Sequence, residues 1–280
     1  MNIIIITGAS SGIGMEFALQ MDNHFDNIDE FWLVARNRSR LTELAKAMGH
    51  RTRIFAMDIT KRENLDMLES MVSEREAADN AGFEKEANEN IRNGISGEQH
   101  IVRMLVNCAG YGMMGNFAGQ NRDTALGMIR LNCEALTDLT HRMIPYMKRN
   151  SRIIQMASSA AFLPQPDFAV YAATKSYVLS FSRALGEELK SRGIYVTSVC
   201  PGPVDTPFFD IAESTGSTLA VKKYTMVSAD RVAALALRAS WKKRSMSVCS
   251  LPIKAFWMLT KSLPHGALLK IIGQMKQKGL

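Results

Sequence analysis

The chain has 280 residues, 46% of them hydrophobic, and its 34 lysines and arginines exceed its 27 acidic residues, giving a formal charge of +7. Length alone suggests two domains, but open α/β sheets often reach this size around a single core. No stretch approaches the roughly 20 unbroken apolar residues of a membrane span, which excludes a transmembrane protein. Because the first expected strand begins at Asn2, we expect no signal peptide.

Short apolar runs rich in β-branched residues alternate with amphipathic stretches along the chain, which predicts repeated β–α units. The expected strands are Asn2–Thr7, Phe31–Ala35, Thr52–Met57, Val102–Asn107, Arg152–Ala157, Tyr195–Cys200 and Ser245–Leu251. The expected helices are Ile13–Phe25, Ser39–Met48, Lys61–Val72, Asp123–Lys148, Ala169–Arg192 and Ala229–Trp241. This order predicts a single-domain α/β fold, a Rossmann-type doubly wound parallel sheet with helices on both faces.

Two segments depart from this alternation. Residues 73–99 are rich in Glu, Asn and Lys and contain glycines, which predicts a polar insertion that extends the third helix into a loop. Residues 252–280 form a basic amphipathic tail after a main domain of residues 1–251, and no acidic residue follows Trp241. Three roles stay open for the tail: lying on an anionic membrane surface, capping a substrate mouth, or contacting a second subunit. The basic charge excess is confined to the tail, so no nucleic-acid partner is expected.

The cysteines and histidines favour neither disulfides nor a metal. Four cysteines lie far apart without a C-x-x-C pair, and the histidines have no metal-ligand spacing. We therefore expect reduced thiols, no metal, and a cytoplasmic location, with peripheral contact at a membrane through the tail as the alternative.

A glycine-rich turn, Thr7-Gly8-Ala9-Ser10-Ser11-Gly12-Ile13-Gly14, follows the first expected strand and opens a helix. Glycines let such a turn bring backbone amides against a pyrophosphate at the positive end of a helix. The position between strand and helix is what separates a dinucleotide-binding turn from a merely structural one.

The end of the second expected strand favours NADP(H) over NAD(H). Ala35 stands where an NAD-preferring protein usually places an acid for the ribose 2′-hydroxyl. Arg36 follows, with Arg38 and Arg40 nearby, and a guanidinium suits a 2′-phosphate. The alternative is that these arginines only begin a solvated helix.

Tyr171 and Lys175 form a Tyr-x-x-x-Lys pair one helical turn apart. An ammonium placed beneath a phenol favours the ionised phenol, which makes the pair an acid–base device.

These motifs resemble those of the short-chain dehydrogenase/reductase family, and the resemblance covers about residues 3–250. It rests on the turn Thr7–Gly14, Asp58 after the third strand, Asn107-Cys108-Ala109-Gly110, Asn132, Ser158, Tyr171 with Lys175, and Pro201-Gly202-Pro203-Val204-Asp205-Thr206. Cys108 replaces the more frequent asparagine of the family, which weakens one tie between strands without touching the reacting atoms. A buried thiol there is packing rather than a nucleophile.

The resemblance implies the roles of individual residues. Tyr171 is the acid–base residue, Lys175 with the nicotinamide lowers the pKa of its phenol, Ser158 donates to the substrate oxygen, and Asn132 positions a water on the lysine. The residues expected to bind the cofactor are Gly8, Ser10, Ser11, Gly12, Ile13, Gly14, Arg36, Asp58, Ile59, Asn107, Ala109, Gly110, Tyr171, Lys175, Pro201, Gly202, Val204 and Thr206. Ser159 competes with Ser158, and spacing to Tyr171 favours Ser158.

The substrate is expected to be a hydrophobic carbonyl or alcohol, such as a lipid-like or steroid-like ketone, because apolar residues crowd the expected pocket. These residues are Phe208, Phe209, Ile211, Leu219, Tyr224 and Met226 in the loop of residues 203–227, with Tyr111, Met113, Met114, Phe117 and Phe162 opposite. Core or dimer packing is the alternative for them. A catalytically idle NADPH-binding protein and an NAD-dependent alcohol dehydrogenase stay open as other functions. The family resemblance implies a homo-oligomer, either a dimer or a tetramer.

Overall fold

The computed structural model describes residues 1–73, 100–208 and 226–277. Most of the polar insertion therefore lies outside the described residues, as do Phe209, Ile211, Leu219 and Tyr224 of the expected substrate loop.

Seven parallel strands form one sheet in the order β3-β2-β1-β4-β5-β6-β9. The strands are β1 (Asn2–Thr7), β2 (Glu30–Ala35), β3 (Thr52–Ala56), β4 (Ile101–Asn107), β5 (Arg152–Met156), β6 (Tyr195–Cys200) and β9 (Met246–Val248). The strand order reverses between β1 and β4, and ligands of such sheets bind at the carboxyl ends of the strands beside that reversal. The predicted single-domain Rossmann-type fold is confirmed.

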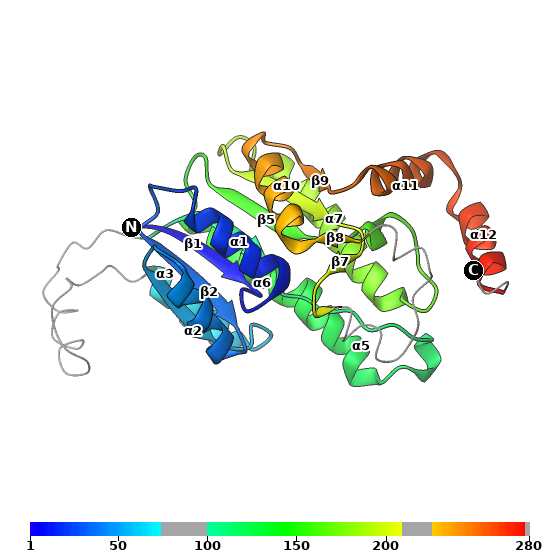
Figure 1. The fold of residues 1–280 in the computed structure, drawn as a ribbon, viewed down its shortest axis with the longest axis horizontal. Coiled ribbons are helices and arrows are strands. Elements are labelled where there is room, and N and C mark those ends of the chain that lie inside the picture. The colour runs from blue at the N-terminus through cyan, green and yellow to red at the C-terminus, as the bar shows by residue number, and fades with distance from the viewer. Residues whose placement is uncertain (74–99, 209–225, 278–280) are drawn as a thin grey trace, which may run out of the picture.

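Helices cover both faces of the sheet (Figure 1). One face carries α1 (Gly12–Asp22), α2 (Arg38–Ala47) and α10 (Ala229–Trp241), and the other carries α3 (Arg62–Ser73), α6 (Leu136–Met143) and α7 (Ala169–Glu188). Along β1, Ile4 and Ile6 belong to the first core and Ile3 and Ile5 to the second. A strand buried on both faces needs such a continuous apolar run rather than an alternating one.

The expected helix Asp123–Lys148 is divided. The chain forms α5 (Arg122–Ile129), a π-helical segment (Arg130–Ala135), α6, and a short 3₁₀ turn (Ile144–Tyr146). Pro145 explains the early end, because proline cannot donate the backbone hydrogen bond that would continue the helix. The π-helical segment adds a wide turn, a feature that is frequent at functional sites.

The tail is helical where it is described. After β9, α11 (Leu251–Ser262) and α12 (His265–Gln277) extend from the body of the molecule (Figure 1). The last expected strand is shorter than predicted because α11 already begins at Leu251, with Pro252 in its first turn. Two-residue strands β7 (Val204–Asp205) and β8 (Val227–Ser228) form a separate small ladder. Among the described residues, none of the helices combines the length and apolar character needed to cross a membrane.

Candidate active site

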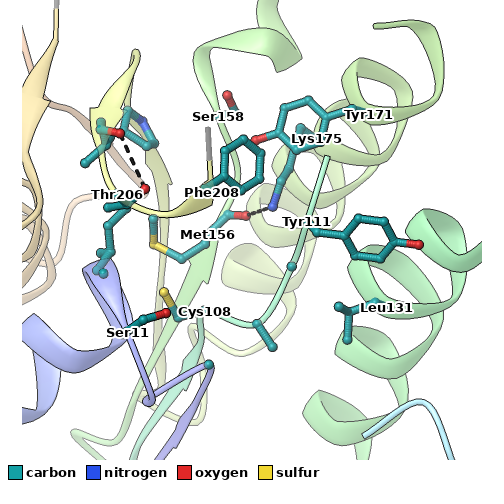
Figure 2. A pocket seen from close by; sticks show the side chains of 18 of the residues that line it. Ser11, Cys108, Tyr111, Leu131, Met156, Ser158, Tyr171, Lys175, Thr206 and Phe208 are labelled. Carbon is teal, nitrogen blue, oxygen red and sulfur yellow. Dashed lines mark hydrogen bonds between the residues drawn. The ribbon is translucent and has the colours of Figure 1, made fainter. Parts of the chain in front are cut away.

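A cavity of about 1000 Å³ runs along the carboxyl ends of β1 to β6 (Figure 2). This volume lies at the upper end of the range for small-molecule sites. The predicted site residues that line the cavity are Gly8, Ser10, Ser11, Gly12, Ile13, Gly14, Arg36, Asp58, Ile59, Ala109, Gly110, Ser158, Tyr171, Lys175, Pro201, Gly202, Val204 and Thr206. Two predicted residues, Asn107 and Asn132, are buried and do not line it. Segments distant in the sequence thus meet in one cavity.

The glycine turn at the end of β1 is too tight for side chains. Gly8 and Gly12 have φ angles of +69° and +54°, a region that favours glycine. A Cβ on Gly8 would lie 2.8 Å from the backbone nitrogen of Ala109, and one on Gly14 would collide with the carbonyl oxygen of Gly8. The first turn of α1 has no acidic residue, and the Ser11 side chain does not cap it. These features fit a pyrophosphate at the helix N-terminus.

Side-chain hydrogen bonds hold the end of β4 in place. The Oγ1 atom of Thr7 accepts from the backbone nitrogens of Cys108 and Ala109, each at 3.1 Å. Asn107 points the other way, into the interior, and its Nδ2 donates to Thr140 Oγ1 at 2.8 Å. Its side chain thus supports β4 from within and does not line the cavity, and the sequence expectation that Asn107 borders the cofactor stays a prediction.

One end of the cavity is rich in exposed guanidinium groups. Arg36 and Arg40 line it, whereas Arg38, which the sequence groups with them, does not. Arg130 also lines the cavity, and its charge, like that of Arg36, acts on Tyr111. The helical pattern did not reveal Arg130 because it opens the π-helical segment. In the described part of the chain, no salt bridge engages these three lining arginines.

Asp58, after β3, lies at the same end. Burial alone would raise the pKa of its carboxyl, but hydrogen bonds from Thr60 and the charges of Arg36 and Lys61 together lower it. The Thr60 backbone nitrogen and hydroxyl donate at 3.0 and 2.8 Å. The carboxylate is therefore ionised, and it already accepts hydrogen bonds from Thr60 of its own loop.

The other end holds Tyr171 and Lys175 side by side, with the Lys175 Nζ 5.6 Å from the centre of the phenol ring (Figure 2). Burial raises the pKa of Tyr171 to about 12, while a hydrogen bond from Ser158 acts to lower it. Burial also lowers the pKa of Lys175 to about 8. Desolvation thus outweighs the hydrogen bond from Ser158, and the expected lowering of the phenol pKa by Lys175 together with the nicotinamide stays a prediction. Lys175 Nζ donates to the Met156 carbonyl oxygen at 2.7 Å.

Ser158 caps the 3₁₀ turn η4 (Ser159–Phe162) and accepts from the Ala160 backbone nitrogen at 3.1 Å. A hydroxyl that accepts in this way still has its own proton to donate. The Ser158 hydroxyl can therefore donate toward Tyr171, and this interaction acts to lower the pKa of the phenol. Ser159 instead makes a backbone hydrogen bond to the Pro201 carbonyl oxygen at 2.8 Å. Both serines line the cavity, and the interaction of Ser158 with Tyr171 favours Ser158.

Asn132 lies in the π-helical segment, and both the oxygen and the nitrogen of its side-chain amide form hydrogen bonds. Its Nδ2 donates to the Tyr111 carbonyl oxygen at 2.9 Å and to Thr174 Oγ1 at 3.1 Å, and its Oδ1 accepts from the Tyr111 backbone nitrogen at 3.1 Å. A Cβ on Gly110 would lie 3.0 Å from Asn132 Oδ1 and 3.4 Å from Lys175 Nζ. Asn132 thus holds the strand-end loop beside Lys175. Its expected role in positioning a water stays a prediction.

Gly112 was missed at the sequence level. A Cβ there would lie 2.7 Å from the Tyr171 ring and 2.9 Å from the Phe168 ring, two rings that stack with centroids 4.3 Å apart. Only glycine lets the backbone pass so close to the phenol. Its place in Gly110-Tyr111-Gly112, immediately after the motif on β4, was the available signal.

Apolar side chains wall the Tyr171 end. Phe208 lies 5.5 Å from the Tyr171 ring, and Met114 and Tyr111 also line the cavity. Pro252, Ile253 and Phe256 of α11 complete this wall, so of the roles left open for the tail the geometry favours a place at the cavity. Three expected residues fall elsewhere: Met113 and Phe162 are not in the lining, and Phe117 is 64% exposed away from it.

All four cysteines are free thiols. Burial raises the pKa of the Cys108 and Cys200 thiols to about 12 and that of Cys249 to about 11. Cys108, Cys133 and Cys200 lie near enough to Lys175 to affect its pKa. Within the described residues, no group of His, Cys, Asp and Glu side chains could hold a metal ion.

The chain matches the profile of the family described as short chain dehydrogenase over residues 2–78 and 77–215. An uncharacterized oxidoreductase from Staphylococcus epidermidis is 30% identical over 208 residues, which cover 73% of this chain and 79% of that protein. A very-long-chain 3-oxoacyl-CoA reductase from Aspergillus oryzae is 30% identical over 206 residues, covering 70% of this chain but only 51% of the relative.

Solved structures agree with this match. A short-chain dehydrogenase from Sphingobium yanoikuyae in complex with NADPH superposes with a TM-score of 0.72 at 25% identity, covering 98% of this chain and 96% of the other. A 3-ketoacyl-(acyl-carrier-protein) reductase from Brucella melitensis complexed with NADH gives a TM-score of 0.68 at 22% identity, covering 88% and 95%. These neighbours bind one or the other nicotinamide cofactor, and the second likeness shows the fold alone.

Proposed function

Because the chain belongs to the short-chain dehydrogenase family, whose members are oxidoreductases of alcohol and carbonyl groups, we propose that it reduces a hydrophobic ketone with NADPH. One observation carries the proposal. A single cavity has a glycine turn and arginines at one end and the Ser158, Tyr171 and Lys175 side chains at the other. A dinucleotide needs both ends, since its phosphates and its reacting ring lie far apart.

In the proposed reaction, NADPH held by the glycine turn and the arginines would supply the hydride that the carbonyl carbon receives. The Ser158 hydroxyl holds the carbonyl oxygen, and Tyr171 transfers its phenolic proton to that oxygen as the C=O double bond becomes a C–OH single bond. In the reverse direction the same phenolate accepts the proton of the alcohol. Both steps use groups already gathered at one end of the cavity.

Lys175 acts on the charge that this proton transfer leaves on Tyr171. With a pKa lowered to about 8 by burial, it still carries its proton at neutral pH. An ammonium near the phenolate stabilises it, because opposite charges attract each other more strongly in a buried site than in water. The Met156 carbonyl oxygen holds the ammonium in place at 2.7 Å, and Asn132 fixes the neighbouring loop, so Asn132 is a positioning residue in this proposal.

We assign NADP(H) rather than NAD(H) from the charges at the other end. Arg36, Arg40 and Arg130 line the cavity there, and the acidic position at the end of β2 is Ala35. Arginine recognises a phosphate through paired hydrogen bonds, whereas a ribose 2′-hydroxyl favours a carboxylate. The Sphingobium neighbour, in complex with NADPH, is compatible with this choice.

We assign a hydrophobic substrate from the apolar wall around Tyr171. Phe208, Met114 and Phe256 offer no partner for a polar substrate body, so the substrate is expected to present its oxygen to Ser158 and its apolar part to these side chains. One relative is named as a very-long-chain 3-oxoacyl-CoA reductase, and a substrate of that kind is a bulky carbonyl compound. The match covers about half of that relative's length.

A cofactor titration tests the proposal. We expect the protein to bind NADPH more tightly than NADH, and to reduce bulky hydrophobic ketones. Binding of NADH alone would support the NAD-dependent alternative, and binding of neither cofactor would overturn the enzyme proposal.

Tyr171→Phe separates an enzyme from an idle cofactor-binding protein. We expect turnover to fall about 10²- to 10⁴-fold while NADPH affinity stays near that of the wild type, because only the proton donor is lost. Tyr177→Phe is the matched control, since Tyr177 lies on the same helix outside the cavity and its hydroxyl bonds to Thr137 at 2.8 Å. A Tyr171→Phe enzyme that turns over at the wild-type rate would remove Tyr171 from the mechanism.

Location and oligomeric state are proposed on narrower grounds. Four free thiols support a reducing compartment and hence the cytoplasm.

A dimer or tetramer built on the helices around Asn132 and Tyr171 is supported by Ile129 on α5, an apolar side chain that is 45% exposed. Light scattering of the wild type and Ile129→Glu would test this, and an unchanged mass would count against that interface.

A further inference from the structure

The outer face of α11 exposes large apolar side chains to solvent. Leu251 is 78% exposed, Met258 63% and Leu259 46%. Leu251, Ala255 and Met258 are spaced four and three residues apart, so they lie along one face of the helix. We call this row the outer stripe. Figure 1 shows α11 at the edge of the molecule, standing out from the sheet and its covering helices.

The opposite face of α11 packs against the body of the molecule and lines the cavity. Ile253 is buried against Phe162 and Val178, and Ile253 and Phe256 line the cavity. A helix with apolar side chains on two opposite faces normally buries both of them. Among the described residues, nothing covers the outer stripe, so α11 separates the proposed substrate site from an uncovered apolar surface.

The charge around the stripe points to an anionic partner. Lys254 and Lys261 flank it on the same side of the helix, and Lys261 Nζ lies 5.0 Å above the Trp257 ring. From residue 242 to the end of the chain there are eight lysines and arginines and no acidic residue. The partner must therefore offer both apolar contacts and negative charge.

A second copy of this chain fits poorly, because a two-fold contact through α11 would set Lys254 and Lys261 against their own copies. An anionic lipid surface satisfies both demands, since apolar side chains enter the acyl boundary while lysines meet the headgroups. We propose that α11 docks on an anionic membrane with the outer stripe inserted, so that a lipid-dissolved ketone enters the cavity past Phe256. The entry part of this inference rests on the proposed function, and the docking part does not.

Vesicle co-sedimentation of the full chain tests the docking. We expect binding to vesicles of phosphatidylcholine with phosphatidylglycerol, and little binding to phosphatidylcholine alone. Lys254→Glu/Lys261→Glu should weaken binding by at least about thirtyfold, because each basic residue near such a surface contributes about fivefold. Met258→Glu should weaken it about tenfold or more, since burying a methionine is of that order.

Matched controls separate the face of α11 from general surface effects. Lys46→Glu/Lys148→Glu makes the same charge change at exposed lysines elsewhere, and Phe117→Glu alters a side chain that is 64% exposed and outside the cavity. Both should bind vesicles as the wild type does to within about twofold. Wild type that binds no anionic vesicles, or control variants that lose as much as the α11 variants, would overturn the proposal.

Two further readouts identify other outcomes. If Met258→Glu halves the mass of the protein in solution, the stripe is an interface between copies, which contradicts the membrane assignment.

With a water-soluble ketone, the turnover rate of Met258→Glu should equal that of the wild type. With a ketone dissolved in vesicles, anionic vesicles should raise the turnover rate of the wild type but not that of Met258→Glu. Vesicle binding without any turnover would leave the docking standing and remove the proposed function, whereas turnover without vesicle binding would do the reverse.

Discussion

The two ends of the cavity both carry positive charge, but they hold it under opposite conditions. Arg36, Arg40 and Arg130 are exposed to solvent and no salt bridge among the described residues engages them, whereas Lys175 is 5% exposed and enclosed by a carbonyl oxygen and thiols. A guanidinium keeps its charge in water and suits a permanent anion. A buried ammonium has a pKa that its surroundings set, which suits a group that works beside a moving proton. Burial thus separates a charge for binding from a charge for chemistry.

The largest expected effect comes from removing the buried charge in Lys175→Met. Burial lowers the folded-state pKa of Lys175 from 10.5 to about 8, so between these values the unfolded chain holds a proton that the folded chain has released. The wild type should therefore gain stability relative to Lys175→Met as pH rises through this window, by about 1.4 kcal/mol per pH unit and about 3 kcal/mol in all. Urea unfolding of both proteins from pH 7 to 10 measures the difference.

The raised thiol pKa values act on both proteins alike and cancel in this difference. Lys190→Met is the control, since Lys190 is 71% exposed and should give no such pH dependence. Parallel pH curves for the wild type and Lys175→Met would mean that Lys175 is not desolvated as the comparison requires.

At the exposed end, Arg36→Ala should weaken NADPH binding by about ten- to a hundredfold and NADH binding by less than about threefold. The expected loss is that of a hydrogen bond to a charged group, about 1.5 to 3 kcal/mol. Arg38→Ala is the neighbouring control, because Arg38 does not line the cavity. Isothermal titration would contradict the 2′-phosphate role if both cofactors lost affinity equally.

A smaller effect is expected from Arg130→Ala, about two- to fivefold in NADPH affinity, since an exposed ion pair contributes at most about 1 kcal/mol. Arg122→Ala, on α5 but outside the cavity, should change nothing. The compound 2′,5′-ADP, which lacks the nicotinamide, should show the same loss as NADPH. Loss of NADH binding to the same extent would place Arg130 against the shared part of the dinucleotide instead.

Local spacing allowed part of the site to be predicted from the sequence. The glycine turn between β1 and α1, and Tyr171 with Lys175 on α7, depend on residues within one turn or one helical repeat, and the structure brings them to one cavity. The alternation of apolar runs was likewise sufficient for the sheet, because central strands such as β1 and β5 are buried on both faces and read as continuous apolar runs. Pro145 indicates that the helix ends before Lys148, but the prediction followed the amphipathic pattern, which continues past this proline.

The remainder depended on how distant segments meet. Arg130 reaches the cavity from a π-helical segment, whose extra residue per turn has no periodic sequence signal. Asn107 carries a motif position but points inward to Thr140, and a period of two along a strand cannot tell which side faces a ligand when both are buried. Ile253 and Phe256 line the cavity only because α11 folds back onto η4, a tertiary contact outside the family pattern.

The high pKa values of the buried thiols have a consequence for the reactivity of the protein. Cys108, Cys200 and Cys249 stay protonated at neutral pH, and a protonated thiol reacts slowly with alkylating agents and peroxide. Two of them, Cys108 and Cys200, lie near the Lys175 ammonium, and Cys108 lines the cavity itself. We therefore expect these three sulfur atoms to stay unmodified when the folded protein meets electrophilic carbonyl compounds or peroxide.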